Sequence, residues 1–388
     1  MNSVIENGVL SIYLEGRITA DTSSTVETEI NTILEQNPHT SLVFNCEKLD
    51  YLSSAGLRVV LRIKKAEPTL KIISVSPSVY EIFEMTGFTE MMTIEKAYKE
   101  ISIDGCEQIG QGSNGKVYRI NPETIVKVYF NKDALADIHR ERELARKAFV
   151  MGIPTAISYD VVKVGDTYGS VFELLNAKSY IKMIQANPCT IDKYIELSVE
   201  LLKKIHSTVV KEGELPDIKL TVLDWVNYLK DYLPNDTYEK LLKMVNEVPD
   251  THTMIHGDYH MKNLMVQDGE TLLIDMDTLA NGHPIFELGS IYNAYVGFSE
   301  LDHDVSMNFL GISNETSNYI WQKTLPLYLN TTDEARIHEV ENKAKIIGYT
   351  RLLRRTIKRE GFDKSADKIT YYKDKLISLI DEVDTLIF

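Results

Sequence analysis

The sequence of 388 residues predicts two domains, an α/β sandwich followed by a larger α+β domain that is strand-rich at first and helical afterwards. Single hydrophobic cores stop growing at roughly 250 to 300 residues, so a chain of this length is expected to divide. Hydrophobic residues make up 44% and charged residues 26%, which provides enough apolar material for two globular cores. The pattern of strands and helices changes near residue 102, where we place the boundary.

Charge and composition limit the partners and the location. The formal charge of −15 repels nucleic-acid phosphates and anionic lipid headgroups, so we expect neither nucleic acid nor a membrane as a partner, and a cationic substrate is weakly favoured. Cys46, Cys106 and Cys189 lie too far apart in sequence for a zinc-ligand spacing or a disulfide framework. We find neither a signal-peptide pattern nor an apolar stretch of roughly 20 residues, and we therefore expect a cytoplasmic protein.

Short strands and helices alternate through the first hundred residues. Residues 8–14 alternate apolar and polar side chains, as in a half-buried strand, and a helical pattern follows at 21–35. Four further elements continue the alternation: strands at 41–44 and 71–75, and helices at 53–65 and 77–85. This alternation predicts an α/β sandwich for residues 1–102.

A turn of small residues, Ser53-Ser54-Ala55-Gly56-Leu57, begins the second of these helices. Hydroxyl side chains are preferred helix caps, so Ser53 is expected to cap the helix. The order of elements and this turn resemble the STAS domain, the fold of anti-sigma factor antagonists. The resemblance implies binding of a protein partner and makes Ser54 a candidate for regulatory phosphorylation. Ser53 stands where the best-known members carry aspartate, and Ala55 where they carry a second hydroxyl residue.

A glycine-rich segment follows the boundary and lies between two strand-like runs. It contains Gly110, Gly112, Ser113, Asn114 and Gly115. The absence of Cβ atoms lets backbone N–H groups approach phosphates, although the same composition is typical of an ordinary hairpin turn. We interpret the segment as a loop that binds nucleotide phosphates.

A lysine then occurs inside an apolar strand pattern. Lys127 lies in the run 124–129, where burial of an ammonium group without a partner would be costly. We therefore expect two anions beside it, a nucleotide phosphate and a glutamate from the helix at 139–144. Glu141 and Glu143 are both candidates for this glutamate.

The segment 255–277 carries the strongest functional pattern. A His-Gly-Asp sequence ends at Asp258, Asn263 follows five residues later, and Asp275 comes directly after an apolar strand. Together these residues provide one group that can handle a hydroxyl nucleophile and two oxygen ligands for Mg²⁺. The pattern predicts a phosphoryl-transfer site.

This pattern closely resembles that of the aminoglycoside phosphotransferases, the choline kinases and their relatives, which have a protein kinase-like fold. The resemblance covers residues 103–388 and implies an N-lobe at 103–175 and a helical C-lobe at 176–388. It implies that Asp258 orients and deprotonates the acceptor hydroxyl, that Asn263 and Asp275 hold magnesium, and that Lys127 contacts the phosphates of ATP. Matching the helix against the family favours Glu143 as the partner of Lys127.

The resemblance also assigns supporting positions. The backbone at Glu173 and Leu175 would hydrogen-bond the adenine ring as a hinge between the lobes. His256 would support the loop, and for His260 a supporting role and a contact with substrate are equally favoured. Glu287 occupies a place where relatives often carry a bracing aspartate, and we interpret it as structural.

These features predict an enzyme that uses ATP and Mg²⁺ to phosphorylate a hydroxyl group of a small molecule. Residues 283–388 are expected to select this acceptor. The acidic residues Glu300, Asp302 and Asp304 are candidates for holding an amine, although such a cluster is also typical of a solvated surface. Two alternatives remain: a partner-switching regulator whose kinase-like domain only binds nucleotide, and a kinase that phosphorylates a protein serine, including Ser54 itself.

Overall fold

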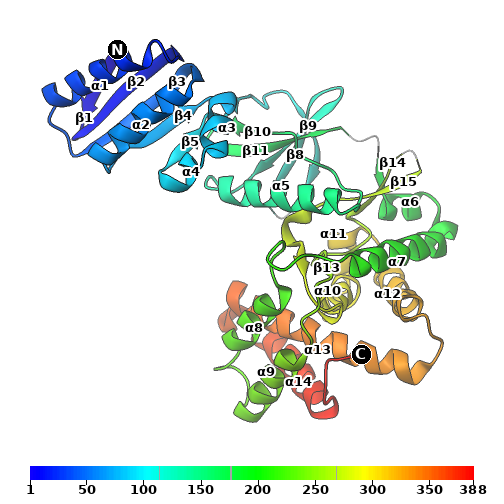
Figure 1. The fold of residues 1–388 in the computed structure, drawn as a ribbon. Coiled ribbons are helices and arrows are strands. Elements are labelled where there is room, and N and C mark those ends of the chain that lie inside the picture. The colour runs from blue at the N-terminus through cyan, green and yellow to red at the C-terminus, as the bar shows by residue number, and fades with distance from the viewer. Residues whose placement is uncertain (113, 175–176, 268) are drawn as a thin grey trace. The chain divides into compact units, whose positions relative to one another are not determined.

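The computed structural model describes residues 1–112, 114–174, 177–267 and 269–388, and the chain divides into two compact units (Figure 1). The smaller unit consists of Met1–Cys106 with two short segments, Val128–Lys132 and Asp160–Gly169. The larger unit consists of Glu107–Lys127, Asp133–Tyr159 and Ser170–Phe388. Within the described residues, no helix combines the length and the apolar composition that crossing a bilayer requires.

The N-terminal part forms a five-stranded sheet in the order β1-β2-β3-β4-β5. Its strands are β1 (Asn2–Glu6), β2 (Val9–Ile18), β3 (Ser41–Leu52), β4 (Lys71–Val75) and β5 (Ile94–Lys96). β1 is antiparallel to β2, and all other neighbours are parallel. The helices are α1 (Ser23–Gln36), α2 (Ser54–Ala66), α3 (Pro77–Met85) and α4 (Phe88–Met91). The predicted α/β sandwich is confirmed, and β1 and β5 are additions to it.

Alternation of side chains explains the core of this sheet. Leu10, Ile12 and Leu14 on β2 are buried, as are Leu42 and Phe44 on β3, while the residues between them are partly exposed. Parallel neighbours require a crossover, and each of the first crossovers is a helix. The helices α1 and α2 lie side by side over the sheet (Figure 1).

A second sheet has six strands in the order β6-β10-β11-β9-β8-β7. The strands are β6 (Lys99–Glu100), β7 (Glu107–Gln111), β8 (Gly115–Asn121), β9 (Thr124–Tyr129), β10 (Asp160–Val164) and β11 (Thr167–Glu173). One helix, α5 (Leu135–Val150), belongs to this part of the chain, as the sequence predicts. On β9 the buried Val126 precedes Lys127, so strand alternation places the lysine on the other face.

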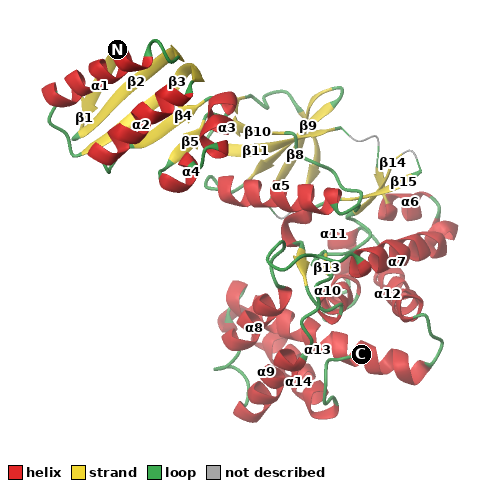
Figure 2. Cartoon of the chain, viewed as in Figure 1, coloured by secondary structure: helices red, strands yellow, loops and turns green. Residues whose placement is uncertain are grey.

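The remainder is mainly helical (Figure 2). Its helices are α6 (Tyr180–Ala186), α7 (Ile191–Ser207), α8 (Ile218–Tyr228), α9 (Asn235–Glu247), α10 (Ile285–Tyr295), α11 (Asp304–Leu310), α12 (Asn314–Leu329), α13 (Glu334–Arg359) and α14 (Phe362–Glu382). Short strands are β12 (Lys178–Ser179), β13 (Met254–Ile255), β14 (Leu264–Gln267), β15 (Glu270–Leu273) and β16 (Ala280–Asn281). Four of these five strands lie between residues 254 and 281.

Helix α10 is the centre of this helical part, because all of its residues are buried. It packs closely against α13 at Gly289, where an added Cβ would lie 2.7 Å from the Ile347 side chain and 3.0 Å from the Ala344 carbonyl oxygen. The Asn293 amide nitrogen donates a hydrogen bond to the Gly348 carbonyl at 2.9 Å, which joins the same two helices. The close approach of α10 and α13 fixes the elements that surround the candidate site.

Candidate functional site

The His-Gly-Asp motif lies in residues 256–263, which we call the Asp258 loop, between strands β13 and β14. His256 is buried; its Nδ1 atom accepts a hydrogen bond from the Asp258 N–H at 3.3 Å, and its carbonyl accepts one from the Thr278 hydroxyl at 2.8 Å. Gly257 has a φ of +84°, and an added Cβ would lie 2.6 Å from the Thr278 carbonyl oxygen. His256 therefore supports the loop, as expected, and the tight turn requires glycine.

The carboxylate of Glu287 holds the start of this loop. One oxygen accepts the N–H of His256 and the other accepts the N–H of Gly257, both at 2.7 Å, and His206 Nε2 lies 3.2 Å from the first. Burial by itself would raise the pKa of this fully buried carboxyl, but the contacts with His206 and His256 lower the pKa below its usual range. The bracing role predicted for Glu287 agrees with these contacts.

Asp258 follows the two braced N–H groups, and its side chain faces His260 and Arg351. Its carboxylate lies 3.6 Å from His260 Nε2. Burial would raise the pKa of Asp258, but His260 and Arg351 outweigh burial and lower the pKa to about 2. Asn263 closes the loop, because its amide nitrogen donates to the Asp258 carbonyl at 3.1 Å. Asp258 is therefore an ionised carboxylate at neutral pH in a fixed backbone turn.

Lys127 has a different glutamate partner from the one that the sequence comparison favoured. Its ammonium group donates to both oxygens of Glu141, at 2.9 and 3.1 Å, and to Asp275 at 3.2 Å. Glu143 instead pairs with Lys147 at 2.8 Å, and its side chain is 57% exposed. Two residues turn an α-helix by roughly 200°, so these two glutamates point to opposite sides of α5. The choice of Glu143 is wrong, and Glu141, the alternative, makes the contact.

Negative charge accumulates at the end of β15. Asp275, at a left-handed φ of 64°, is followed closely by Asp277, whose carboxylate accepts a hydrogen bond from the Asn114 amide at 3.3 Å. Burial raises the pKa of Asp277 to about 7, and the nearby Asp275 and Glu141 add to this rise. The structure therefore brings Lys127, Asn114, Asp275 and Asp277 together, although sequence analysis gave Asp277 no role.

The glycine loop joins β7 to β8, and the N–H of Gly112 donates to the Gly115 carbonyl at 2.9 Å. Neither Gly110 nor Gly112 has a left-handed φ, and a Cβ on Gly112 would meet no described atom within 4 Å. The backbone conformation therefore does not require glycine at these positions, which leaves approach by a ligand as a reason for it. Ser113 lies outside the described residues.

The expected hinge lies at the end of β11, where Glu173 is the last residue of the strand and is exposed. The N–H of the next residue, Leu174, donates to the Glu123 carbonyl at 2.7 Å. Leu175 lies outside the described residues, so the adenine contact expected there stays a prediction.

Arg351 is a site residue that the sequence analysis missed. It comes from α13, and its Nη1 atom donates to the Ser290 hydroxyl at 2.8 Å and lies 3.5 Å from the Gly257 carbonyl oxygen. Tyr295 was also missed; its hydroxyl accepts the N–H of Met261 in the Asp258 loop at 2.9 Å. Neither belongs to a short motif, and the only signal was the density of arginines between residues 351 and 359.

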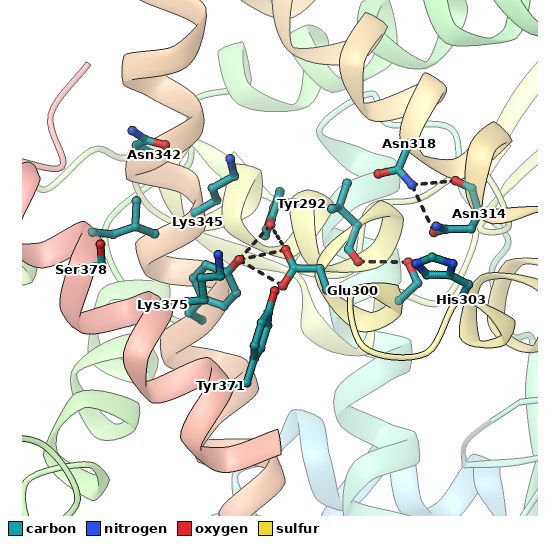
Figure 3. Close-up of a pocket in the computed structure, with 14 residues that line it drawn as sticks. Tyr292, Glu300, His303, Asn314, Asn318, Asn342, Lys345, Tyr371, Lys375 and Ser378 are labelled. Atoms are coloured by element: carbon teal, nitrogen blue, oxygen red, sulfur yellow. Dashed lines mark hydrogen bonds between the residues drawn. The ribbon is translucent and has the colours of Figure 1, made fainter. Parts of the chain in front are cut away.

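A cavity of about 490 Å³ lies among α10, α12, α13 and α14 (Figure 3). Glu300 lines it, and its carboxylate accepts hydrogen bonds from the hydroxyls of Tyr292 and Tyr349. Tyr292 is turned by roughly 140° from Glu287 around α10, and Tyr349 by roughly 200° from Arg351 around α13. The cavity therefore lies on other faces of these helices than the contacts with the Asp258 loop. Because the Glu300 carboxylate already accepts these two tyrosine hydroxyls, it is a weaker candidate for binding an amine.

The STAS-like turn has the expected cap. The Ser53 hydroxyl accepts the N–H of Gly56 at 3.3 Å, while Ser54 is the first residue of α2 and is exposed. Arg58, one turn later, is also exposed, and the first turn of α2 contains no acidic residue. Ser53 is thus the capping residue, and Ser54 is accessible to a modifying enzyme.

We expect Glu287→Gln to destabilise the larger unit by about 3 kcal/mol, because an amide replaces one acceptor oxygen with a donor that faces a backbone N–H. Urea unfolding measures this loss, and faster hydrogen exchange at His256 and Gly257 locates it. Since the folded pKa is lowered, the contribution of Glu287 is complete above its usual pKa of about 4.3 and is lost as pH falls through the folded value. Glu143→Gln is the exposed control; equal stability of the two variants would refute the bracing role.

Comparison with protein families and solved structures places this geometry in context. The family described as "Phosphotransferase enzyme family" matches residues 105–311, and the family "STAS domain" matches residues 1–101. BtrV of Bordetella bronchiseptica, a protein assigned as an anti-sigma factor antagonist, is 29% identical over 92 residues, which cover 23% of this chain and 78% of BtrV.

Among solved structures, ADP-bound aminoglycoside phosphotransferase APH(2'')-Ib aligns with a TM-score of 0.48 and 16% identity over 79% of this chain and 99% of that chain. A choline/ethanolamine kinase family protein from Mesorhizobium loti aligns with a TM-score of 0.42 and 15% identity over 71% and 87%. The match to the phosphotransferase family spans more than half of the chain. The chain therefore belongs to the phosphotransferase enzyme family and carries an N-terminal STAS domain.

Proposed function

We propose that this phosphotransferase transfers the γ-phosphoryl group of ATP to a hydroxyl group of an acceptor, with Mg²⁺ bound at the site. The observation that carries the proposal is the adjacency of separate segments: Lys127 on β9 contacts Asp275 at 3.2 Å, and Asn263 binds the backbone of Asp258 at 3.1 Å. The Ile274 N–H, next to Asp275, donates to the Asn263 carbonyl at 3.0 Å and links the two pairs. A merely structural lysine would not require this set of carboxylate and amide groups.

In the proposed reaction Asp258 positions the acceptor hydroxyl. The hydroxyl oxygen forms a bond to the γ-phosphorus, the bond from that phosphorus to the β,γ-bridging oxygen breaks, and ADP leaves. The proton of the hydroxyl passes to the Asp258 carboxylate. A pKa of about 2 makes Asp258 a weak base, so the side chain acts mainly by orientation and receives the proton late, as suits a loose transition state.

The residues present suit magnesium. The amide nitrogen of Asn263 donates to the Asp258 carbonyl. The side-chain oxygen of Asn263 has no hydrogen-bond partner among the described residues. Burial, and then the neighbouring Asp275 and Glu141, raise the pKa of Asp277, and a divalent cation would offset the repulsion among these carboxylates. The described part of the chain has no group of three or more His, Cys, Asp or Glu side chains arranged around a metal, so Asn263 and Asp275 would share the ion with phosphate and water. When bound, the ion neutralises charge on the transferred phosphate.

The nucleotide is proposed to bind between the glycine loop and the hinge. Gly110, Gly112, Asn114 and Gly115 would face the phosphates, since the space around Gly112 is open. Lys127, oriented by the two hydrogen bonds that it donates to Glu141, would neutralise phosphate charge. Backbone groups near Glu173 would bind adenine.

Asp258→Asn is expected to lower the rate of phosphoryl transfer by roughly 10²- to 10⁴-fold, because the amide cannot accept the proton of the hydroxyl. Nucleotide affinity should change little, since Asp258 faces the acceptor. Turnover is measured with an acceptor panel, and binding of ADP by calorimetry. Unchanged turnover in the variant would remove Asp258 from the mechanism.

Glu141→Gln is expected to raise the KM for ATP and to reduce kcat, because Lys127 loses the charged partner that orients its ammonium group. The matched control is Glu143→Gln, which makes the same change two residues along the same helix. Steady-state kinetics at varied ATP compare the two. If Glu143→Gln were the more damaging change, Glu141 would not be the functional partner.

We also propose that the STAS domain binds a protein partner and that phosphorylation of Ser54 controls this binding. Ser54 is exposed at the N-terminus of α2, where a phosphate would meet free backbone N–H groups and the positive end of the helix dipole. Arg58 lies one turn along the helix, at a spacing that permits an ion pair with that phosphate. BtrV, which resembles this domain, is named as an anti-sigma factor antagonist.

Ser54→Asp should weaken recovery of the partner from cell extract, whereas Ser54→Ala should not. The carboxylate carries about one charge against roughly −1.5 to −2 for phosphate, so the effect will be partial. The added acid at the helix start should stabilise the domain by roughly 0.3–1 kcal/mol, which shows that weaker binding is not misfolding. Identical recoveries by both variants would leave Ser54 without a regulatory role.

A further inference from the structure

Helix α13 presents a row of arginines beside the Asp258 loop. Arg351, Arg355 and Arg359 are spaced by four residues, which places them along one side of an α-helix. Arg351 reaches the Gly257 carbonyl, one residue before Asp258, at 3.5 Å. The row therefore begins next to Asp258, the residue that would orient the acceptor.

A chain of ring contacts connects the middle of this row to the same loop. The Arg355 guanidinium lies 4.9 Å from the centre of the Phe298 ring, which packs against Phe309 at 5.8 Å. Phe309 in turn packs against His260 at 5.1 Å, and His260 lies 3.6 Å from the Asp258 carboxylate. The contacts that start at Arg351 and those that start at Arg355 thus both end in the Asp258 loop.

In the described part of the chain, these three arginines form no direct ion pair. Among the described residues, no carboxylate lies within 4.0 Å of the guanidinium groups of Arg351, Arg355 or Arg359, whereas the neighbouring Arg354 pairs with Asp224 at 3.1 Å. The one acid nearby on α13, Glu360, is engaged by Ser365 and Lys368. Asp258 and Glu287 act on Arg351 from a distance, and Glu360 acts on Arg355, but none of them forms a direct ion pair with these guanidinium groups.

Guanidinium groups that lie close together repel one another. Burial lowers the pKa of Arg351 and of Arg355, and repulsion from Arg359 adds to this, while Asp258 and Glu287 raise the pKa of Arg351 and Glu360 raises that of Arg355. Arginine remains charged even so, because its usual pKa exceeds 12. A site that keeps three like charges together gains most from a ligand that brings the opposite charge, and the planar guanidinium forms paired hydrogen bonds with phosphate and carboxylate.

We propose that the acceptor is an alcohol that also carries an oxyanion group, a phosphate or a carboxylate, bound by Arg355 and Arg351 so that its hydroxyl lies at Asp258. This inference rests on the proposed function, and it names the acceptor class of the same site. It replaces the cationic substrate that the net charge weakly favoured. A protonated amine would be repelled by this row, and the carboxylate of Glu300 already receives two phenolic hydrogen bonds.

The first experiment measures anion binding without requiring turnover. The full chain is saturated with ADP and Mg²⁺, so that the nucleotide site is filled, and inorganic phosphate is titrated by calorimetry. Arg355→Gln should weaken phosphate binding by roughly tenfold or more, the loss expected for charged hydrogen bonds. The matched control is Arg336→Gln on the same helix, since Arg336 pairs with Glu339 near the other end. Equal affinity in wild type and Arg355→Gln, or no phosphate binding, would overturn the proposal.

The second experiment identifies the acceptor class. ADP formation is compared for hydroxy acids, for sugar phosphates and for amino alcohols and amino sugars. Turnover of an anionic class, with a KM that rises in Arg355→Gln while kcat changes little, supports the proposal, and the preferred class distinguishes carboxylate from phosphate. Preference for an amine overturns it but leaves the phosphotransferase function intact. Arginine-dependent phosphate binding without transfer to any class supports the anion site and contradicts the proposed function.

Discussion

The carboxylate of Glu287 is the constraint on which the arrangement of the site depends. Its two oxygens accept the N–H groups of His256 and Gly257, and these hydrogen bonds fix the backbone directly before Asp258. An ionised group in a dry interior is tolerated only when its hydrogen bonds are satisfied, and here His206 provides a third contact. Because Glu287 lies on α10, which packs closely on α13 at Gly289, the same helix also fixes the distance from Asp258 to Arg351.

The surroundings shift the pKa values of two carboxyl groups in this site in opposite directions. His260 and Arg351 lower the pKa of Asp258 to about 2, whereas burial, Asp275 and Glu141 raise the pKa of Asp277 to about 7. Such a separation is typical of sites in which neighbouring acids have different tasks. Lys127 lies on the side of Asp275 and Arg351 on the side of Asp258, so one cation serves each side of the proposed transfer.

Sequence patterns predicted the site residues that lie within one short segment. They missed the contacts that depend on which side of a helix a residue occupies, or on residues far apart in the chain. The groups at Asp258, Asn263 and Asp275 lie within one short segment, so their chemistry could be read directly, whereas the choice between Glu141 and Glu143 required knowing which side of α5 faces β9. Arg351 comes from a helix far along the chain and carries no motif. Strand β1 was missed because all of its side chains are exposed, so no alternation marks it.

The proposed anionic acceptor is opposite in charge to the substrate that net charge weakly favours, and screening gives a physical reason for the difference. Charges on exposed side chains are screened within about 8 to 10 Å at ordinary ionic strength, so the −15 of the whole chain is felt weakly inside a pocket. Arg351 is half-buried beside the Asp258 loop, where screening is weaker, whereas Arg355 is exposed, and no carboxylate lies within 4.0 Å of either guanidinium group among the described residues. A bound anion would therefore be affected more by these nearby arginines than by the distant surface charges. An acidic surface would then slow the approach of an anionic acceptor while the arginines bind it, so its association rate, more than its affinity, should respond to salt.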